Sequence, residues 1–120
     1  MAPEDAAPLL NDAGGLYRGA AALVVRPGSV DECASVVRIC HDARIGVVPQ
    51  GGNTGYCGGA TPFDGEQRQI LLSLTRLNRV REVDGVGFTM TAEAGVVLAR
   101  AQDAAREHGL KFALSMSSEG

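Results

Sequence analysis

Tryptophan is absent from this chain, and aromatic residues make up only 4% of its 120 residues. Its core must therefore be built from Val, Leu, Ile and Ala. Lysine is nearly absent too: Lys111 is the one lysine among 11 basic residues, and no basic cluster with interleaved aromatic residues occurs. The net charge is −3. Because nucleic-acid binding depends on a cationic surface that neutralises phosphates, we do not expect a nucleic-acid partner.

Cysteine is scarce, with three residues. Cys33, Cys40 and Cys57 have no CxxC spacing and no nearby histidine pair, which argues against a zinc site. Cys33 and Cys40 lie about 10 Å apart along a predicted helix, too far for a disulfide. We expect buried thiols at these two positions and a passive loop residue at Cys57.

Long hydrophobic runs are also missing. No stretch approaches the ~20 apolar residues of a membrane-spanning helix, so no membrane span is expected. The first twenty residues carry Glu4, Asp5 and Asp12 and lack the order of a secretory signal, so we expect a cytoplasmic protein. The preference for Arg, Ala and Gly is typical of a GC-rich bacterial genome. The length and the 21% charged residues are ordinary for one modest globular domain.

Apolar periodicity predicts an α+β fold that begins with a strand, a helix and a strand. A short apolar run predicts a strand at 22–25, and Ser29 with Glu32 forms a capping box that starts a helix over 29–44. Gly46 is the expected helix terminator. The run 45–48, closed by Pro49, predicts a strand parallel to the first, with a right-handed crossover. The buried face of the helix is predicted to comprise Val30, Cys33, Val36, Val37, Cys40 and Ala43.

The remaining elements are predicted from the spacing of apolar residues and from the positions of turn-forming residues. Strands are expected at 69–74 and 110–114, and a hairpin at 79–94 closed by the turn Asp84–Gly87. A second amphipathic helix is expected over 97–108, ending at Gly109 and burying Leu98, Ala101 and Ala105. Residues 1–16 are expected to form an N-terminal arm with a short helical turn at 7–11. Residues 17–120 are expected to be the first part of a domain that continues beyond Gly120.

The stretch Pro49–Gly59, which we call the glycine loop, has the sequence PQGGNTGYCGG. Its glycines allow positive φ and a close approach of backbone N–H groups to an anion. It is not a Rossmann fingerprint, because Asn53 stands where a second glycine is required, and no Lys-Ser/Thr pair follows as in a Walker A loop. Many backbone donors without a lysine suit the diphosphate of a dinucleotide. A surface loop without a ligand is the alternative.

Six pieces of the chain together resemble a known family. In order and spacing they are similar to the FAD-linked oxidase domain of the vanillyl-alcohol oxidase type, also called the PCMH-type FAD-binding domain. Within that family the similarity is greatest to D-lactate and D-2-hydroxyglutarate dehydrogenases. The pieces are residues 17–19, 25–29, 49–60, 74–80, 91–96 and 118–120.

The resemblance implies FAD as the cofactor and FAD contacts for two groups of residues. These are Pro49, Gln50, Gly51, Gly52, Asn53, Thr54, Gly55, Gly58 and Gly59 in the loop, and Ser115, Ser117 and Ser118 near the C-terminus. Residues 51–55 would wrap the pyrophosphate, residues 49–50 would set the entry, and residues 58–59 would pass near the flavin. Some relatives attach FAD through a His at the position of Asn53, so non-covalent FAD is expected here. In the C-terminal stretch the family often has Pro and Asp where this chain has Ala113 and Ser115.

The resemblance also implies an activity. The whole protein would oxidise a small 2-hydroxy acid by hydride transfer to FAD, with the base, the carboxylate clamp and any metal beyond Gly120. The electron acceptor is not indicated. An FAD-dependent oxidase of an alcohol or sugar, and a non-catalytic module that binds a phosphorylated ligand, are the alternatives.

Other polar residues have simpler interpretations. His41 and His108 are expected to be solvated at helix C-termini. Glu93 is expected either to hydrogen-bond nearby backbone or to be solvated. The arginines at positions 76, 79 and 81 are expected to form an exposed face.

Overall fold

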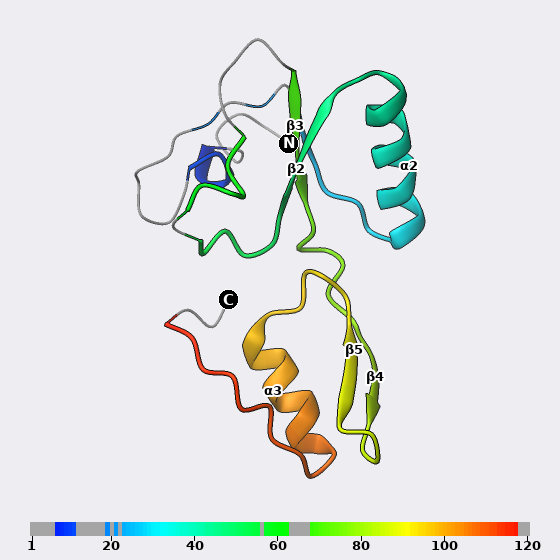
Figure 1. Cartoon of the computed structure of the whole chain (residues 1–120), viewed down its shortest axis with the longest axis vertical. Helices are drawn as coiled ribbons and strands as arrows, with labels where there is room; N and C mark the ends of the chain where they lie inside the picture. The colour runs from blue at the N-terminus through cyan, green and yellow to red at the C-terminus, as the bar shows by residue number, and fades with distance from the viewer. Residues whose placement is uncertain are drawn as a thin grey trace.

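The computed structural model describes residues 7–11, 19, 21, 23–55, 57–62 and 68–117. The chain forms two parts that follow each other along the longest axis of the molecule (Figure 1). The first contains a small parallel sheet and one helix, and the second contains a hairpin and one helix. The predicted α+β class, with parallel strands followed by antiparallel ones, is therefore confirmed.

The first part is a three-stranded parallel sheet in the order β1-β3-β2. Its strands are β1 (Leu23–Val25), β2 (Gly46–Gln50) and β3 (Gln69–Ser73). The helix α2 (Val30–Asp42) connects β1 to β2 and packs on the sheet, while the short 3₁₀ helix η1 (Ala7–Leu9) lies on the side of the sheet away from α2 (Figure 1). Because β3 is the central strand, its residues Ile70, Leu71 and Leu72 are all buried.

The second part is an antiparallel hairpin covered by a helix. The strands β4 (Val80–Asp84) and β5 (Thr89–Ala92) pair, and α3 (Leu98–Glu107) packs beside β4. One Asp84 carboxylate oxygen accepts hydrogen bonds from the N–H groups of Val86 and Gly87, at 3.0 and 2.9 Å. These bonds, led by the one from Gly87, lower the pKa of Asp84. The predicted Asp-Gly turn is therefore present, with the aspartate as its hydrogen-bond acceptor.

The start of α2 agrees with the predicted capping box except for one bond. Ser29 Oγ accepts from the Glu32 N–H at 3.2 Å, as expected. The Glu32 carboxylate accepts from the N–H of Gly28 at 2.6 Å, rather than from that of Ser29. The hydrogen bond that Glu32 makes back to the chain is therefore one residue earlier than a capping box predicts.

The end of α2 differs from the prediction. Gly46 is already the first residue of β2, and the left-handed position is taken by Arg44, with φ of 54°. The Arg44 N–H donates to the carbonyl of His41, and the Ile45 N–H to that of Cys40. This is the hydrogen-bond pattern of a Schellman motif. A residue with a side chain thus occupies the position that glycine usually takes.

Pro49 also differs from the prediction, because it lies inside β2 rather than closing it. The Gly46 N–H donates to Arg68, and the Gln50 carbonyl accepts from Leu74. Even-numbered residues of β2 therefore face β3, and Pro49 faces outward. An edge strand tolerates proline at such a position, because no ladder hydrogen bond is lost.

Two further predictions need correction. Residues 110–114 form no strand: they lie in an irregular segment that runs back along α3, with Phe112 and Leu114 40% and 50% exposed. On the helix faces, Cys40, Ala104 and Ala105 are buried, whereas Val30 and Val37 are largely exposed. All three cysteines are free: Cys40 is buried as expected, Cys33 is only partly buried rather than buried, and Cys57 is exposed.

The two parts meet where Gly95 packs on the turn at Leu74–Leu77. The Gly95 N–H donates to the Leu77 carbonyl at 2.7 Å. A Cβ on Gly95 would overlap the carbonyl oxygen of Leu74 and lie 2.8 Å from that of Leu77. Only glycine allows this approach of backbone to backbone.

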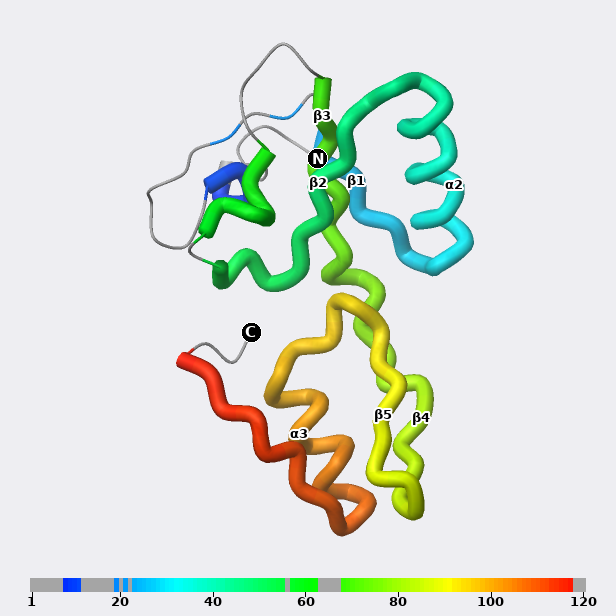
Figure 2. Tube along the Cα trace, viewed as in Figure 1, coloured from blue at the N-terminus to red at the C-terminus, as the bar shows by residue number. Residues whose placement is uncertain are grey.

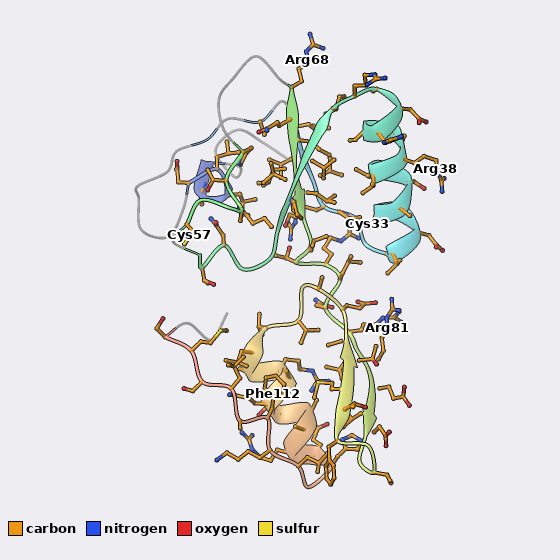
Figure 3. All side chains as sticks on the ribbon, viewed as in Figure 1. Cys33, Arg38, Cys57, Arg68, Arg81 and Phe112 are labelled. Atoms are coloured by element: carbon orange, nitrogen blue, oxygen red, sulfur yellow. The ribbon has the colours of Figure 1, made fainter. Side chains whose placement is uncertain are left out.

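Beside this contact, Glu93 ties the start of β4 to the end of β5. Its carboxylate accepts from the Arg79 N–H at 3.0 Å and from the guanidinium groups of Arg79 and Arg81 at 3.2 to 3.4 Å. The side chain of Glu93 is only 7% exposed, while those of Arg79 and Arg81 are exposed (Arg81 is labelled in Figure 3). The bond from the Arg79 N–H is the main reason why the pKa of Glu93 is lowered. Of the two expectations for Glu93, the hydrogen-bonded one is confirmed.

Replacing Arg44 by glycine is expected to stabilise the fold by about 1 kcal/mol. A left-handed residue with a Cβ costs ~1–2 kcal/mol, and glycine's greater freedom in the unfolded chain offsets part of that gain. Urea unfolding measures the change. The control is Ala43→Gly one residue earlier, where φ is −84° and glycine should lower stability. Equal loss of stability in both variants would contradict the left-handed conformation of Arg44.

Glu93→Gln should remove an acid-dependent part of the stability. Because folding lowers the pKa of Glu93 below the ordinary 4.5, its charge stabilises the fold above that pH, and the benefit disappears as pH falls through the folded-state value. The difference in unfolding free energy between wild type and variant, measured in urea from pH 7 to pH 3, should therefore shrink below pH 4.5. Glu82→Gln, at an exposed residue of β4, is the control. A difference that stays constant with pH would show that the charge is not responsible.

Candidate functional site

The glycine loop leaves the sheet from the edge where β2 and β3 both end. Gln50, the last residue of β2, pairs with Ser73, the last residue of β3. Open α/β sheets bind ligands at the carboxyl ends of their strands, because the connections that leave there diverge. The loop and the segment that follows β3 therefore start side by side.

The backbone N–H groups of Gly51–Gly55 have no hydrogen-bond acceptor among the residues that the structure describes. Gly52, Thr54 and Gly55 are exposed, and Gly51 and Asn53 are partly exposed. Backbone donors of this kind are satisfied by water or by a ligand. Successive unpaired N–H groups in a turning backbone are what an anion-binding nest requires.

A cleft of about 550 Å³ lies between this loop and the second part of the molecule. Its volume is within the ~300–1,000 Å³ typical of small-molecule sites. In Figure 2 the glycine loop belongs to the upper part of the chain and the C-terminal segment to the lower part. The cleft is lined by Gly52, Thr54, Thr75, Asn78, Ala94, Gly95, Val96, Val97, Leu98, Arg100 and Met116.

The far wall of the cleft is the first turn of α3. Val97 is the N-cap residue and makes no side-chain capping bond, and the first turn contains no acidic residue. The N-terminal N–H groups of a helix carry partial positive charge and favour anions. Arg100, in the same turn, carries a positive charge that is shared with the exposed Glu107 carboxylate 3.8 Å away, and none of the described residues that line the cleft is acidic. The cleft is therefore suited to an anionic group on both of its walls.

Residues 51–55, predicted to bind a cofactor, differ in how they lie relative to the cleft. Gly52 and Thr54 line the cleft. Gly51 lies close behind them, since a Cβ there would come 3.9 Å from the Ala94 carbonyl oxygen. The side chain of Asn53 points away, toward the N-terminal arm, so only its backbone is available. Gly55 is exposed, with nothing within 4 Å of where a Cβ would be.

The other predicted residues do not line the cleft. Pro49 is exposed on the edge of β2, and Gln50 is buried beneath the loop. Gly58 is buried and Gly59 exposed on the returning half of the loop, on the same side as Cys57 in Figure 3. Ser115 and Ser117 are exposed on either side of Met116, which reaches the cleft; Ser118 lies outside the described residues.

Sequence reasoning gave no role to Thr75, Asn78 and Arg100, which line the cleft. A signal was present for the first two, since they directly follow a predicted strand parallel to the one before the glycine loop. Such residues gather at one edge of a sheet. Arg100 had no comparable signal, because its place depends on how the second part packs on the first.

The cleft can bind and orient, but it holds no group suited to proton transfer. Its side chains are hydroxyls, one carboxamide, one guanidinium and apolar groups. In the part of the chain that the structure describes, no group of three or more His, Cys, Asp or Glu residues is arranged to hold a metal ion. Neither helix of that part has the length and apolar character that crossing a membrane requires. A diphosphate fits this donor set, because amides, hydroxyls and Arg100 complement its charge and no carboxylate opposes it.

Comparison with known proteins agrees with this geometry. Residues 21–120 match a family model described as an FAD binding domain. A D-2-hydroxyglutarate–pyruvate transhydrogenase of Saccharomyces cerevisiae is 38% identical over 119 residues, which is 98% of this chain and 23% of that protein. A D-2-hydroxyglutarate dehydrogenase of Xanthomonas citri pv. viticola is 40% identical over 97 residues, or 81% of this chain and 20% of that protein.

A solved structure shows that the chain shares its fold with a known protein. An alkyldihydroxyacetonephosphate synthase superposes with a TM-score of 0.77 at 23% identity, over 88% of this chain and 19% of that one. The chain thus spans about a fifth of the length of the proteins it matches. The family match confirms the predicted cofactor, FAD, and covers nearly the whole chain. The chain belongs to the FAD binding domain family.

Proposed function

We propose that this chain is the FAD-holding part of an oxidoreductase that oxidises a 2-hydroxy acid of the D-lactate or D-2-hydroxyglutarate type by hydride transfer to non-covalently held FAD. The names of the relatives support the substrate class. The observation that carries the binding role is the row of unpartnered N–H groups at Gly51–Gly55, which borders a cleft without acidic residues.

The residues of the cleft hold the diphosphate from two sides in this proposal. The N–H groups of Gly52 and Thr54 donate from the glycine loop, and the first-turn N–H groups of α3 donate from the opposite wall. Thr75 and Asn78 also line the cleft, and the Thr75 hydroxyl is held in place by hydrogen bonds with Arg26 and Ser73. Arg100 compensates one of the negative charges.

The cofactor supplies the hydride acceptor when it is bound, and the protein supplies binding and orientation. Asn53 offers no nucleophile, and its carboxamide is engaged with the arm, which supports non-covalent attachment. The described residues that line the cleft include no base, so we assign removal of the substrate's hydroxyl proton to residues other than these.

Replacing Gly52 by valine is expected to abolish FAD retention in the full-length protein, because Gly52 lines the cleft and a β-branched side chain would crowd the backbone donors there. Bound flavin per chain, measured by absorbance after gel filtration, gives the result. The matched control is Gly85→Val in the hairpin turn, where a Cβ meets nothing within 4 Å. A folded Gly52→Val protein that keeps its full flavin content would overturn the proposed site.

Substrate class is tested by anaerobic flavin bleaching in the full-length protein. D-lactate and D-2-hydroxyglutarate are each compared with their L-enantiomers, and reoxidation by oxygen is compared with reoxidation by an artificial electron acceptor. We expect bleaching by at least one D-enantiomer and faster reoxidation by the artificial acceptor. Bleaching only by alcohols or sugars, followed by rapid reaction with oxygen, would instead show an oxidase.

A further inference from the structure

Two side-chain carboxamides of the glycine loop hold the same short segment of the N-terminal arm. Gln50 Nε2 donates to the carbonyl oxygens of Leu9 and Ala60, at 2.7 and 3.0 Å. Asn53 Nδ2 donates to those of Pro8 and Asn11, at 3.2 and 2.7 Å. A primary amide nitrogen carries two protons, so both donors are fully used.

The orientation of Gln50 follows from its surroundings. Its side chain is among the most completely buried in the molecule, with 1% of the residue exposed. Only the nitrogen end of the amide can face two carbonyl oxygens, so the oxygen end points elsewhere. Gln50 Oε1 is buried and finds no partner among the described residues. Because an unpaired buried acceptor is unfavourable, its presence indicates that the bonds to residues 9 and 60 determine the orientation.

Asn53 adds a constraint on the backbone of the loop. Its φ is 55°, in the left-handed region that few residues other than glycine adopt, and asparagine is among the exceptions. The two bonds from its side chain to residues 8 and 11 hold it in this conformation. The direction of the neighbouring N–H groups at Gly52 and Thr54, which line the cleft, depends on that backbone turn.

A glycine-rich segment without such support would be costly to order. Fixing the backbone of one residue costs roughly 1–2 kcal/mol in conformational entropy, and glycine is at the upper end. When a ligand binds a loop that is not held in place, this entropic cost weakens its affinity. When the loop is already ordered, the ligand binds without that cost. Three of the four supporting bonds come from the arm, and the fourth comes from Ala60, which directly follows the loop.

We propose that residues 8–11, held by Gln50 and Asn53, form a clasp that preorganises the glycine loop for a diphosphate ligand. Gln50 and Asn53 are then positioning residues, since their side chains act through the arm and not on the ligand. The inference rests on the proposed function, because it concerns the same loop. It adds that cofactor affinity is set in part by a segment that lies outside the cleft.

The test uses the full-length protein with its FAD in four forms: wild type, a deletion of residues 1–11, Asn53→Gly, and the deletion combined with Asn53→Gly. Glycine at position 53 tolerates the left-handed backbone and removes only the carboxamide. The control is Cys57→Ala, at an exposed loop residue outside the clasp. FAD release is followed by the rise in flavin fluorescence. In flavin-free protein, exchange of the Gly19 amide, which donates to the Leu10 carbonyl, reports how firmly the arm is held.

We expect FAD release to be about tenfold faster in the deletion and in Asn53→Gly, since a lost pair of ordinary hydrogen bonds has about that effect. The combined form should match the deletion alone, because the acceptors of Asn53 are already gone. Gly19 exchange should be about threefold faster in Asn53→Gly and unchanged in Cys57→Ala. The proposal would be contradicted by an unchanged rate of FAD release in the deletion or in Asn53→Gly. It would also be contradicted if the two changes had additive effects in the combined form, or if Gly19 amide exchange were unchanged in Asn53→Gly. A wild type that retains no FAD would overturn the proposed function itself. If the deletion fails to fold, Asn53→Gly decides alone.

Discussion

The position of every group in the cleft depends on the contact of Gly95 with the turn at Leu74–Leu77. This contact joins the parallel sheet to the hairpin and its helix, and it does so through backbone atoms without an intervening side chain. The glycine loop belongs to the first part and the N-terminus of α3 to the second, as Figure 1 shows. A change of even one methyl group at Gly95 would therefore shift one wall of the cleft against the other. The hydrogen-bonded Glu93 reinforces the same junction from the hairpin side.

The chemistry of the cleft is that of recognition, with charge complementarity supplied mostly by the main chain. Backbone N–H groups have fixed directions once the fold is formed, so they lose little entropy when an anion arrives. Thr75, Asn78 and Arg100 add side-chain donors to this frame. A family that performs different reactions can retain such a frame unchanged, because the frame addresses the cofactor and not the substrate.

Much of the fold was predictable because local signals agreed with the tertiary structure. The capping residue Ser29 and the turn residue Asp84 each specify their element through a hydrogen bond that needs no distant partner. The errors arose where position in the sheet decided the outcome: Pro49 is tolerated inside β2 only because β2 is an edge strand. Arg44 accepts a left-handed conformation that sequence rules reserve for glycine. The loop wall of the cleft could be inferred from its glycines, whereas the α3 wall required the packing of the two parts.

Pro49 has a consequence for how the sheet can grow. Its ring replaces the donor that an added strand would need halfway along the free side of β2. A strand of a neighbouring molecule that pairs with this side would lack one hydrogen bond at Pro49. Edge-to-edge association, which leads to aggregation, is thereby disfavoured. At the opposite margin of the described sheet, Leu23–Val25 contain no proline, so all three residues keep their backbone N–H groups.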